Sequence, residues 1–223
     1  MNGILPSSAR ARAPERSARL SARTKILRAA MALEDHRSVH EHTVDELAAS
    51  ANVAKGSVYY HFGSKERLVQ EMLIYGASEL MDIMEEFDAN SGGAEGADDV
   101  RTQYRQQVTS AFEFLNTFPS FTGLVAFAMA RSQAQESEQL RAGKEAMIAL
   151  IANRLERLDK AAVSVGLRDV LTPPNSLEIT ATGLLSAAVT LSIERHTSHP
   201  ERTVEECVEA LVRMSLPEVP IRS

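Results

Sequence analysis

The chain has 223 residues, of which 44% are hydrophobic and 24% are charged, a balance typical of a globular protein with a sizeable core. Its single cysteine, Cys207, excludes disulfides and cysteine-ligated metal clusters within one chain, and its apolar runs fall short of the ~18 residues that a membrane span needs. The net charge of −6 by itself argues against a nucleic-acid partner. Residues 1–75, however, hold 11 basic and 8 acidic side chains, so this part of the chain is basic and could meet a polyanion.

The basic excess begins at the amino terminus. Residues 1–18 mix Arg, Ser, Ala and Pro with few apolar side chains, which predicts a mobile basic tail. An organellar transit peptide has a similar composition and stays open as an alternative to a cytoplasmic protein. The tail either contacts a polyanion or only adds solubility.

Apolar residues recur three or four positions apart from residue 20 onward, without strand-like alternation, which predicts an all-α protein. A capping box at Thr43 and Glu46 and a capping serine at Ser64 mark two helix starts. Residues 90–96 are expected to form a loop. The expected helices cover residues 20–34, a short segment after Thr43, a second short segment after Asn52, and residues 65–90, 98–117, 119–133, 136–165, 176–197 and 201–215.

Residues 43–65 carry the most informative pattern. Two short helices with apolar inner faces meet at Asn52, a residue that tolerates left-handed backbone, which predicts a helix-turn-helix. In this motif the second helix enters the major groove of DNA with its amino end first. Its outward side chains suit phosphates and base edges; they are Lys55, Ser57, Tyr59, Tyr60 and His61.

The run from Lys55 to Lys65 is similar to the signature of the TetR family of bacterial transcriptional repressors, and residues 24–73 resemble that family's DNA-binding domain. The chain departs from the family's usual pattern at Glu34, Ser38 and Asn52. The resemblance implies a homodimer with a three-helix DNA-binding domain over residues 19–66 and a helical ligand-binding and dimerisation domain over residues 67–223. It also implies operator contacts by Thr43, Lys55, Gly56, Ser57, Tyr59, Tyr60, His61 and Lys65.

Five of the seven phenylalanines lie within residues 112–129. Core packing explains most of them, but the resemblance places a ligand-binding domain here, and methionines make adaptable cavity walls. We therefore expect a largely apolar effector site. Its candidate residues are Met72, Met84, Phe112, Phe127, Met129 and Met147.

Small residues share one stripe of the helix expected over residues 176–197. They allow close helix contact, either inside one subunit or across a two-fold axis. The resemblance implies that the last two helices form a four-helix bundle with their symmetry mates. The candidate interface residues are Gly183, Ala187, Thr190 and Leu211.

No catalytic site, metal or cofactor is expected. The histidines His36, His40 and His42 lie in a polar loop where solvation explains them, and the acidic neighbours of Cys207 are expected to raise its pKa. The pattern predicts a dimeric repressor that binds an inverted-repeat operator and is released by a small, largely apolar effector. A ligand-independent architectural DNA binder is the alternative, and an all-helical enzyme lacks any supporting motif in the sequence.

Overall fold

We describe the fold from a computed structural model over residues 21–33, 39, 41–90, 96–130, 138–166 and 173–216, without the side chains of residues 86–90, 138–140 and 174–175. These residues form helices and connecting turns only, which confirms the all-α prediction. The predicted tail, residues 91–95 of the predicted loop, and Glu34, His36, Ser38 and His40 lie outside the described residues. The helices are α2 (Ala22–Met31), α3 (Val44–Ser50), α4 (Lys55–Phe62), α5 (Lys65–Asn90), α6 (Ala97–Thr117), α7 (Pro119–Ala130), α8 (Glu138–Ser164), α9 (Pro174–His196) and α10 (Val204–Ser215).

Local capping explains where the first helices begin. The Ser21 hydroxyl accepts a hydrogen bond from the Thr24 amide at 3.1 Å, so α2 begins at residue 22 and is shorter at both ends than the predicted 20–34. The predicted capping box of α3 is confirmed. Thr43 Oγ1 accepts from the Glu46 amide at 3.2 Å, and the Glu46 carboxylate accepts from the Thr43 amide at 2.7 Å.

Two turn residues fix the angles between the short helices. Asn52 has a φ of 53°, so the left-handed backbone predicted between α3 and α4 is confirmed. Gly63 ends α4 with a φ of 76°, a conformation that side-chain-bearing residues rarely adopt. The Ser64 hydroxyl then accepts from the Arg67 amide at 3.2 Å and starts α5, as its position in the sequence predicts.

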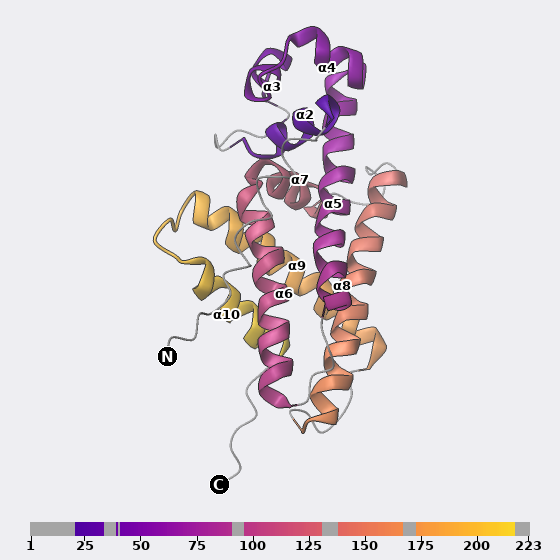
Figure 1. The fold of residues 1–223 in the computed structure, drawn as a ribbon, viewed down its shortest axis with the longest axis vertical. Helices are drawn as coiled ribbons and strands as arrows, with labels where there is room; N and C mark the ends of the chain where they lie inside the picture. Colours follow the sequence, from indigo (N-terminus) through magenta and orange to yellow (C-terminus); the bar gives the residue numbers. More distant parts are fainter. Residues whose placement is uncertain are drawn as a thin grey trace, which may run out of the picture.

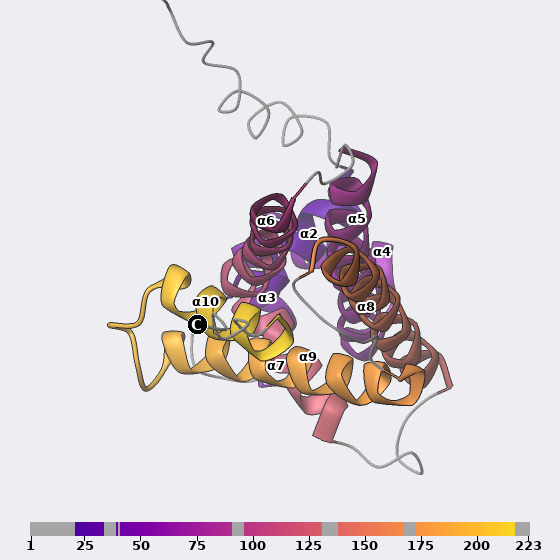
Figure 2. The same ribbon diagram turned by 90° about the horizontal axis from the view of Figure 1, so that it is seen from below.

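The short helices lie at one end of an elongated molecule, and α5 extends from them along its length (Figure 1). Seen along the long axis, α6 stands on one side, α5 and α8 stand on another, and α9 with α10 closes the third (Figure 2). One buried cluster joins α2 to α5 with α7 and the end of α6. A second joins α6 and α8 to α9 and α10. Because α5 belongs to the first cluster and runs toward the second, it connects the two halves of the molecule.

Helix α9 is more apolar than the sequence analysis allowed. Residues 176–196 are long and apolar enough to span a membrane by length and composition, a test that core helices of globular proteins also pass. In this fold α9 packs against α6, α7, α8 and α10. Three of its polar side chains bond within the helix, since the hydroxyls of Thr180, Thr182 and Ser186 each donate to a carbonyl four residues earlier.

Candidate nucleic-acid interface and cavity

Helix α4 divides into a buried face and an exposed face, as the sequence predicts. Val58 and Phe62 are almost fully buried against the neighbouring helices. On the other face Tyr60 is 85% exposed and Tyr59 is 46% exposed. Lys55 and Gly56 are also exposed, whereas Ser57, His61 and Lys65 are half-buried. The outward surface of α4 therefore consists of hydroxyl, aromatic and cationic groups.

The amino end of α4 presents backbone as well as side chains. Its first turn holds no acidic residue, and Ala54 at the N-cap gives no side-chain hydrogen bond. A Cβ built on Gly56 would meet no atom within 4 Å, so this glycine borders open space. An exposed helix amino end with these properties attracts phosphate groups.

Lys55 has a partner that the sequence analysis did not identify. Its ammonium group lies 2.7 Å from the carboxylate of Asp45 on α3. This hydrogen bond raises the pKa of Lys55, so the lysine is cationic throughout the physiological range. Thr43, also predicted to touch DNA, is exposed while its hydroxyl caps α3.

The platform behind α4 is fixed by contacts with the neighbouring helices. The Arg23 guanidinium on α2 lies 5.4 Å from the Phe62 ring centroid and forms an ion pair with Glu71 on α5. The Arg67 guanidinium reaches the other oxygen of the same carboxylate at 3.3 Å. Arg23 of α2 thus contacts both α4 and α5 and links these two helices.

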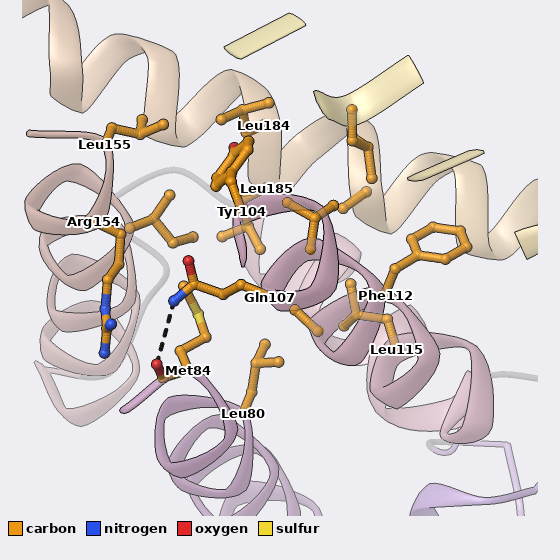
Figure 3. Close-up of a pocket in the computed structure, with 15 residues that line it drawn as sticks. Leu80, Met84, Tyr104, Gln107, Phe112, Leu115, Arg154, Leu155, Leu184 and Leu185 are labelled. Atoms are coloured by element: carbon orange, nitrogen blue, oxygen red, sulfur yellow. Dashed lines mark hydrogen bonds between the residues drawn. The ribbon is translucent and has the colours of Figure 1, made fainter. Parts of the chain in front are cut away.

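A cavity of about 90 Å³ lies in the other half of the molecule, between α5, α6, α8, α9 and α10 (Figure 3). Its walls are mainly apolar. The lining residues are Leu80, Met84, Tyr104, Gln107, Val108, Ala111, Phe112, Leu115, Ile151, Arg154, Leu155, Leu184, Leu185, Ala188 and Leu211.

Two of the six candidate ligand residues, Met84 and Phe112, line this cavity. The other four lie elsewhere because α7 contributes no lining residue and because the walls begin further along α5 and α8. Phe127 on α7 is 48% exposed, and Met129 packs half-buried against the first cluster. Met72 and Met147 are buried in that cluster.

The candidate dimer residues differ in how far they are exposed. Gly183 and Thr190 are exposed on α9, and Ala187 is half-buried against the second cluster. Leu211 is 3% exposed and lines the cavity, because the apolar face of α10 turns inward, so within one subunit it packs inside and not on the surface.

Arg154 was not among the predicted site residues, yet it is 8% exposed and lines the cavity. A signal was present, since this charge interrupts the apolar stripe of α8 between Ile151 and Leu155. Cys207 is buried, and burial is the main cause that raises its pKa; the predicted direction holds, although acidic neighbours contribute less.

Comparison with known proteins agrees with this arrangement. Residues 26–72 match the family model described as bacterial regulatory proteins, tetR family. Over 61 residues the chain is 38% identical to the HTH-type transcriptional repressor KstR2 of Rhodococcus jostii (strain RHA1). That match covers 27% of this chain and 30% of the relative, so the chain spans under a third of the curated relative's length.

Solved structures share the fold over most of the chain. A TetR-like transcriptional regulator from Rhodococcus sp. RHA1 has a TM-score of 0.58 at 18% identity, covering 88% of this chain and 96% of that one. FadR of Bacillus subtilis, solved with stearoyl-CoA, has a TM-score of 0.62 at 13% identity, with coverages of 88% and 98%. FadR of Thermus thermophilus, solved with lauroyl-CoA, has a TM-score of 0.51 at 24% identity, with coverages of 90% and 96%.

At these identities the solved structures establish the fold, and the family model covers the helix-turn-helix whose geometry is described above. The two findings agree with the signature around α4. Residues 26–72 therefore carry the helix-turn-helix of the tetR family of bacterial regulatory proteins, and the described fold is similar to that of a solved TetR-like regulator.

Proposed function

We propose that the protein is a cytoplasmic, homodimeric transcriptional repressor that binds an inverted-repeat operator and is released by a small, largely apolar effector. It acts by binding and not by catalysis. The observation that carries the proposal is the course of α5, which begins at Lys65, directly after α4, and lines the cavity with Leu80 and Met84.

In the proposed complex α4 enters the major groove with its amino end first. Lys55, Lys65 and the amide groups of the first turn meet phosphates, while Tyr59, Tyr60 and His61 reach base edges or sugars. Gly56 allows the backbone to approach the duplex, since no side chain stands between them.

The proposed release works through contacts between α5 and the DNA-binding helices. Glu79, next to Leu80 of the cavity wall, accepts a hydrogen bond from Arg28 of α2 at 2.6 Å. The Arg28 guanidinium also lies 5.0 Å from the ring centroid of Phe118, at the end of α6. An effector that displaces α5 or α6 therefore shifts α2 and, with it, α4. In the dimer, the distance between the two copies of α4 then no longer matches the ~34–36 Å that separates adjacent half-sites of the operator.

The nature of the lining supports an effector with an aliphatic body. Two relatives in fold were solved with stearoyl-CoA and lauroyl-CoA. The cavity of about 90 Å³ is smaller than the roughly 300–1,000 Å³ of ligand pockets. A ligand larger than a few atoms must move side chains such as Met84, and this displacement is the proposed link to α5.

The outer face of α9 supports the proposed dimer. Only 28% of its apolar window is buried within the subunit, and Ile179 on this helix is 74% exposed. Gly183 and Thr190 lie exposed on the same helix, where small side chains let a second helix approach closely. A second copy covers this surface in the proposal.

The test is to select genomic DNA fragments on the purified protein and to measure binding to the enriched sequence at fixed salt. We expect an inverted repeat, bound by a dimer, and weaker binding by Tyr59→Ala without loss of helical content. Enrichment of no common sequence would contradict the proposed operator and favour the architectural alternative.

A further inference from the structure

The side chain of Gln107 places an amide in a cavity wall that is otherwise mainly apolar. Gln107 stands on α6 and is half-buried among the lining residues. A buried amide lowers stability unless its N–H groups and its oxygen find hydrogen-bond partners. The partners that this amide has, and the one that it lacks, therefore indicate what the cavity binds.

The orientation of the amide follows from its contact with α5. Gln107 Nε2 donates to the Met84 carbonyl at 3.3 Å. A backbone carbonyl can only accept, so the nitrogen must face Met84 and Oε1 must face away from it. Figure 3 shows this oxygen directed away from Met84, toward the space among the lining side chains. Within the described part of the chain no group donates to it.

The hydroxyl of Tyr104 is the other neutral polar group of the described lining, and its proton is used within the protein. Ser215 Oγ lies 2.6 Å from this hydroxyl. The Ser215 hydroxyl donates to the carbonyls of Leu211 and Val212, at 3.0 and 3.2 Å. The Tyr104 hydroxyl is therefore the donor to Ser215, and the neutral groups of the wall offer a ligand acceptor oxygens but no free O–H.

The charge of Arg154 in the same wall restricts the kind of donor that fits. Burial and the positive charge of Arg157 lower the pKa of the Arg154 guanidinium, and the carboxylate of Glu85 raises it. The guanidinium stays protonated at neutral pH, so it repels a cationic donor such as an amine.

An anionic head group does not suit this position either. It would meet the lone pairs of Gln107 Oε1, because both groups are acceptors. Arg154 favours an anion only where the anion touches the guanidinium itself, which Figure 3 shows directed away from Tyr104. A neutral hydroxyl donates to Oε1 and is repelled by neither group.

We infer that the effector has an apolar body and a neutral hydroxyl group, and that Gln107 Oε1 accepts the hydrogen bond from this hydroxyl. The inference rests on the proposed function, because it specifies the ligand of the same cavity. A hydroxyl bound there polarises the amide and strengthens its bond to the Met84 carbonyl. Occupation of the cavity then acts directly on α5, the helix that leads to the DNA-binding helices.

The experiment titrates the full-length protein, labelled with 13C at the methionine methyl groups, with three probes in the absence of DNA. The probes are cyclohexanol, cyclohexanone and cyclohexanecarboxylate, which share one small ring and differ in the polar group. The Met84 methyl signal, assigned with Met84→Leu, reports the cavity, and the signals of Met72 and Met147 in the first cluster serve as internal references. We expect cyclohexanol to shift the Met84 signal and to bind roughly ten-fold more tightly than either other probe.

The variants compare two probes on one protein, so a general loss of stability does not imitate the expected result. Gln107→Met keeps the length of the side chain but removes the acceptor, and cyclohexanol and cyclohexanone should then bind about equally. Gln106→Met is the matched control, since Gln106 is exposed on the same helix, and it should keep the preference for cyclohexanol. Tyr104→Phe should also keep it.

The inference is overturned if no probe shifts the Met84 signal, or if cyclohexanone or cyclohexanecarboxylate binds as tightly as cyclohexanol. It is also overturned if Gln107→Met keeps the preference, or if Tyr104→Phe abolishes it and so moves the acceptor to Tyr104. The ranking of the probes by the unaltered protein tests the inference even if a variant does not fold. Failure of the proposed function is separate: operator that stays bound while cyclohexanol occupies the cavity contradicts effector release and leaves the role of Gln107 intact.

Discussion

At the scale of single residues, the pair formed by Lys55 and Asp45 opposes DNA binding in the proposed complex. The lysine must exchange an exposed carboxylate at 2.7 Å for a phosphate, and the carboxylate itself repels the duplex. We expect Asp45→Asn to tighten DNA binding several-fold at low salt, with the gain shrinking as salt rises. Fluorescence anisotropy across a salt series measures this.

Glu205→Gln is the matched control for the same net charge, because Glu205 is exposed on α10, away from α4. It should leave affinity nearly unchanged. An equal gain from both variants would assign the effect to net charge and not to release of Lys55.

Lys65, at the start of α5, should act through phosphate. Lys65→Ala is therefore expected to weaken operator and unrelated DNA by similar factors and to lower the salt slope by about one. Lys160→Ala provides the comparison, since Lys160 pairs with Glu156 on α8 at 2.7 Å. A loss confined to the operator would instead place Lys65 at a base edge.

Residue-scale prediction worked best where local chemistry alone decides the outcome. The cap at Thr43 and the left-handed Asn52 depend on a few neighbouring residues and are confirmed. The Asp45 contact and the position of Arg154 in the cavity depend on how separate helices cross, so spacing along the sequence could not give them. The place of Leu211 in the cavity wall depends on helix crossing in the same way.

At the scale of elements, α5 and α7 approach each other at Gly76. A Cβ on this buried glycine would overlap the ring of Phe121, which is fully buried and cannot swing away. Gly76→Ala should lower stability by about 1–3 kcal/mol, although alanine favours helix by about 1 kcal/mol. Thermal melting at fixed protein concentration checks the sign.

The control is Gly143→Ala on α8, where an added Cβ meets no atom within 4 Å. This variant should raise stability by about 0.5–1 kcal/mol through helix propensity alone. If both glycine variants stabilise the protein, then α7 does not pack closely enough against α5 at Gly76 to exclude a Cβ.

Helix positions followed from periodicity within a few residues, because each apolar stripe packs into one of the two clusters. Periodicity did not show which of these apolar faces line the cavity. Five phenylalanines within residues 112–129 indicated an apolar centre, yet α7 turns its side chains toward α2, α5 and α9, and only Phe112 among the five lines the cavity. Periodicity identifies the buried face of a helix and not its neighbours.

At the scale of the whole molecule, regulation requires that the two clusters respond to each other. The ion pair of Arg28 with Glu79 and the hydrogen bond from Ser120 to the Leu33 carbonyl, at 3.0 Å, join α2 to α5 and α7. The side chains of Arg28 and Glu79 are half-buried, so their ion pair contributes little to stability by itself. Their proposed importance lies in transmitting a shift of α5 to the DNA-binding helices.

The proposed dimer makes the last prediction, and Gly183 is the position that tests it. A Cβ on Gly183 meets no atom within 4 Å of its own subunit, whereas Ala187 packs partly against the second cluster. Gly183→Trp should therefore block association across α9 without overpacking the subunit, and the monomer should bind a full operator far more weakly because it spans one half-site. Gly143→Trp, equally open on α8, should stay dimeric. Sedimentation at micromolar concentration distinguishes them, and a dimeric Gly183→Trp protein would move the interface away from this face of α9.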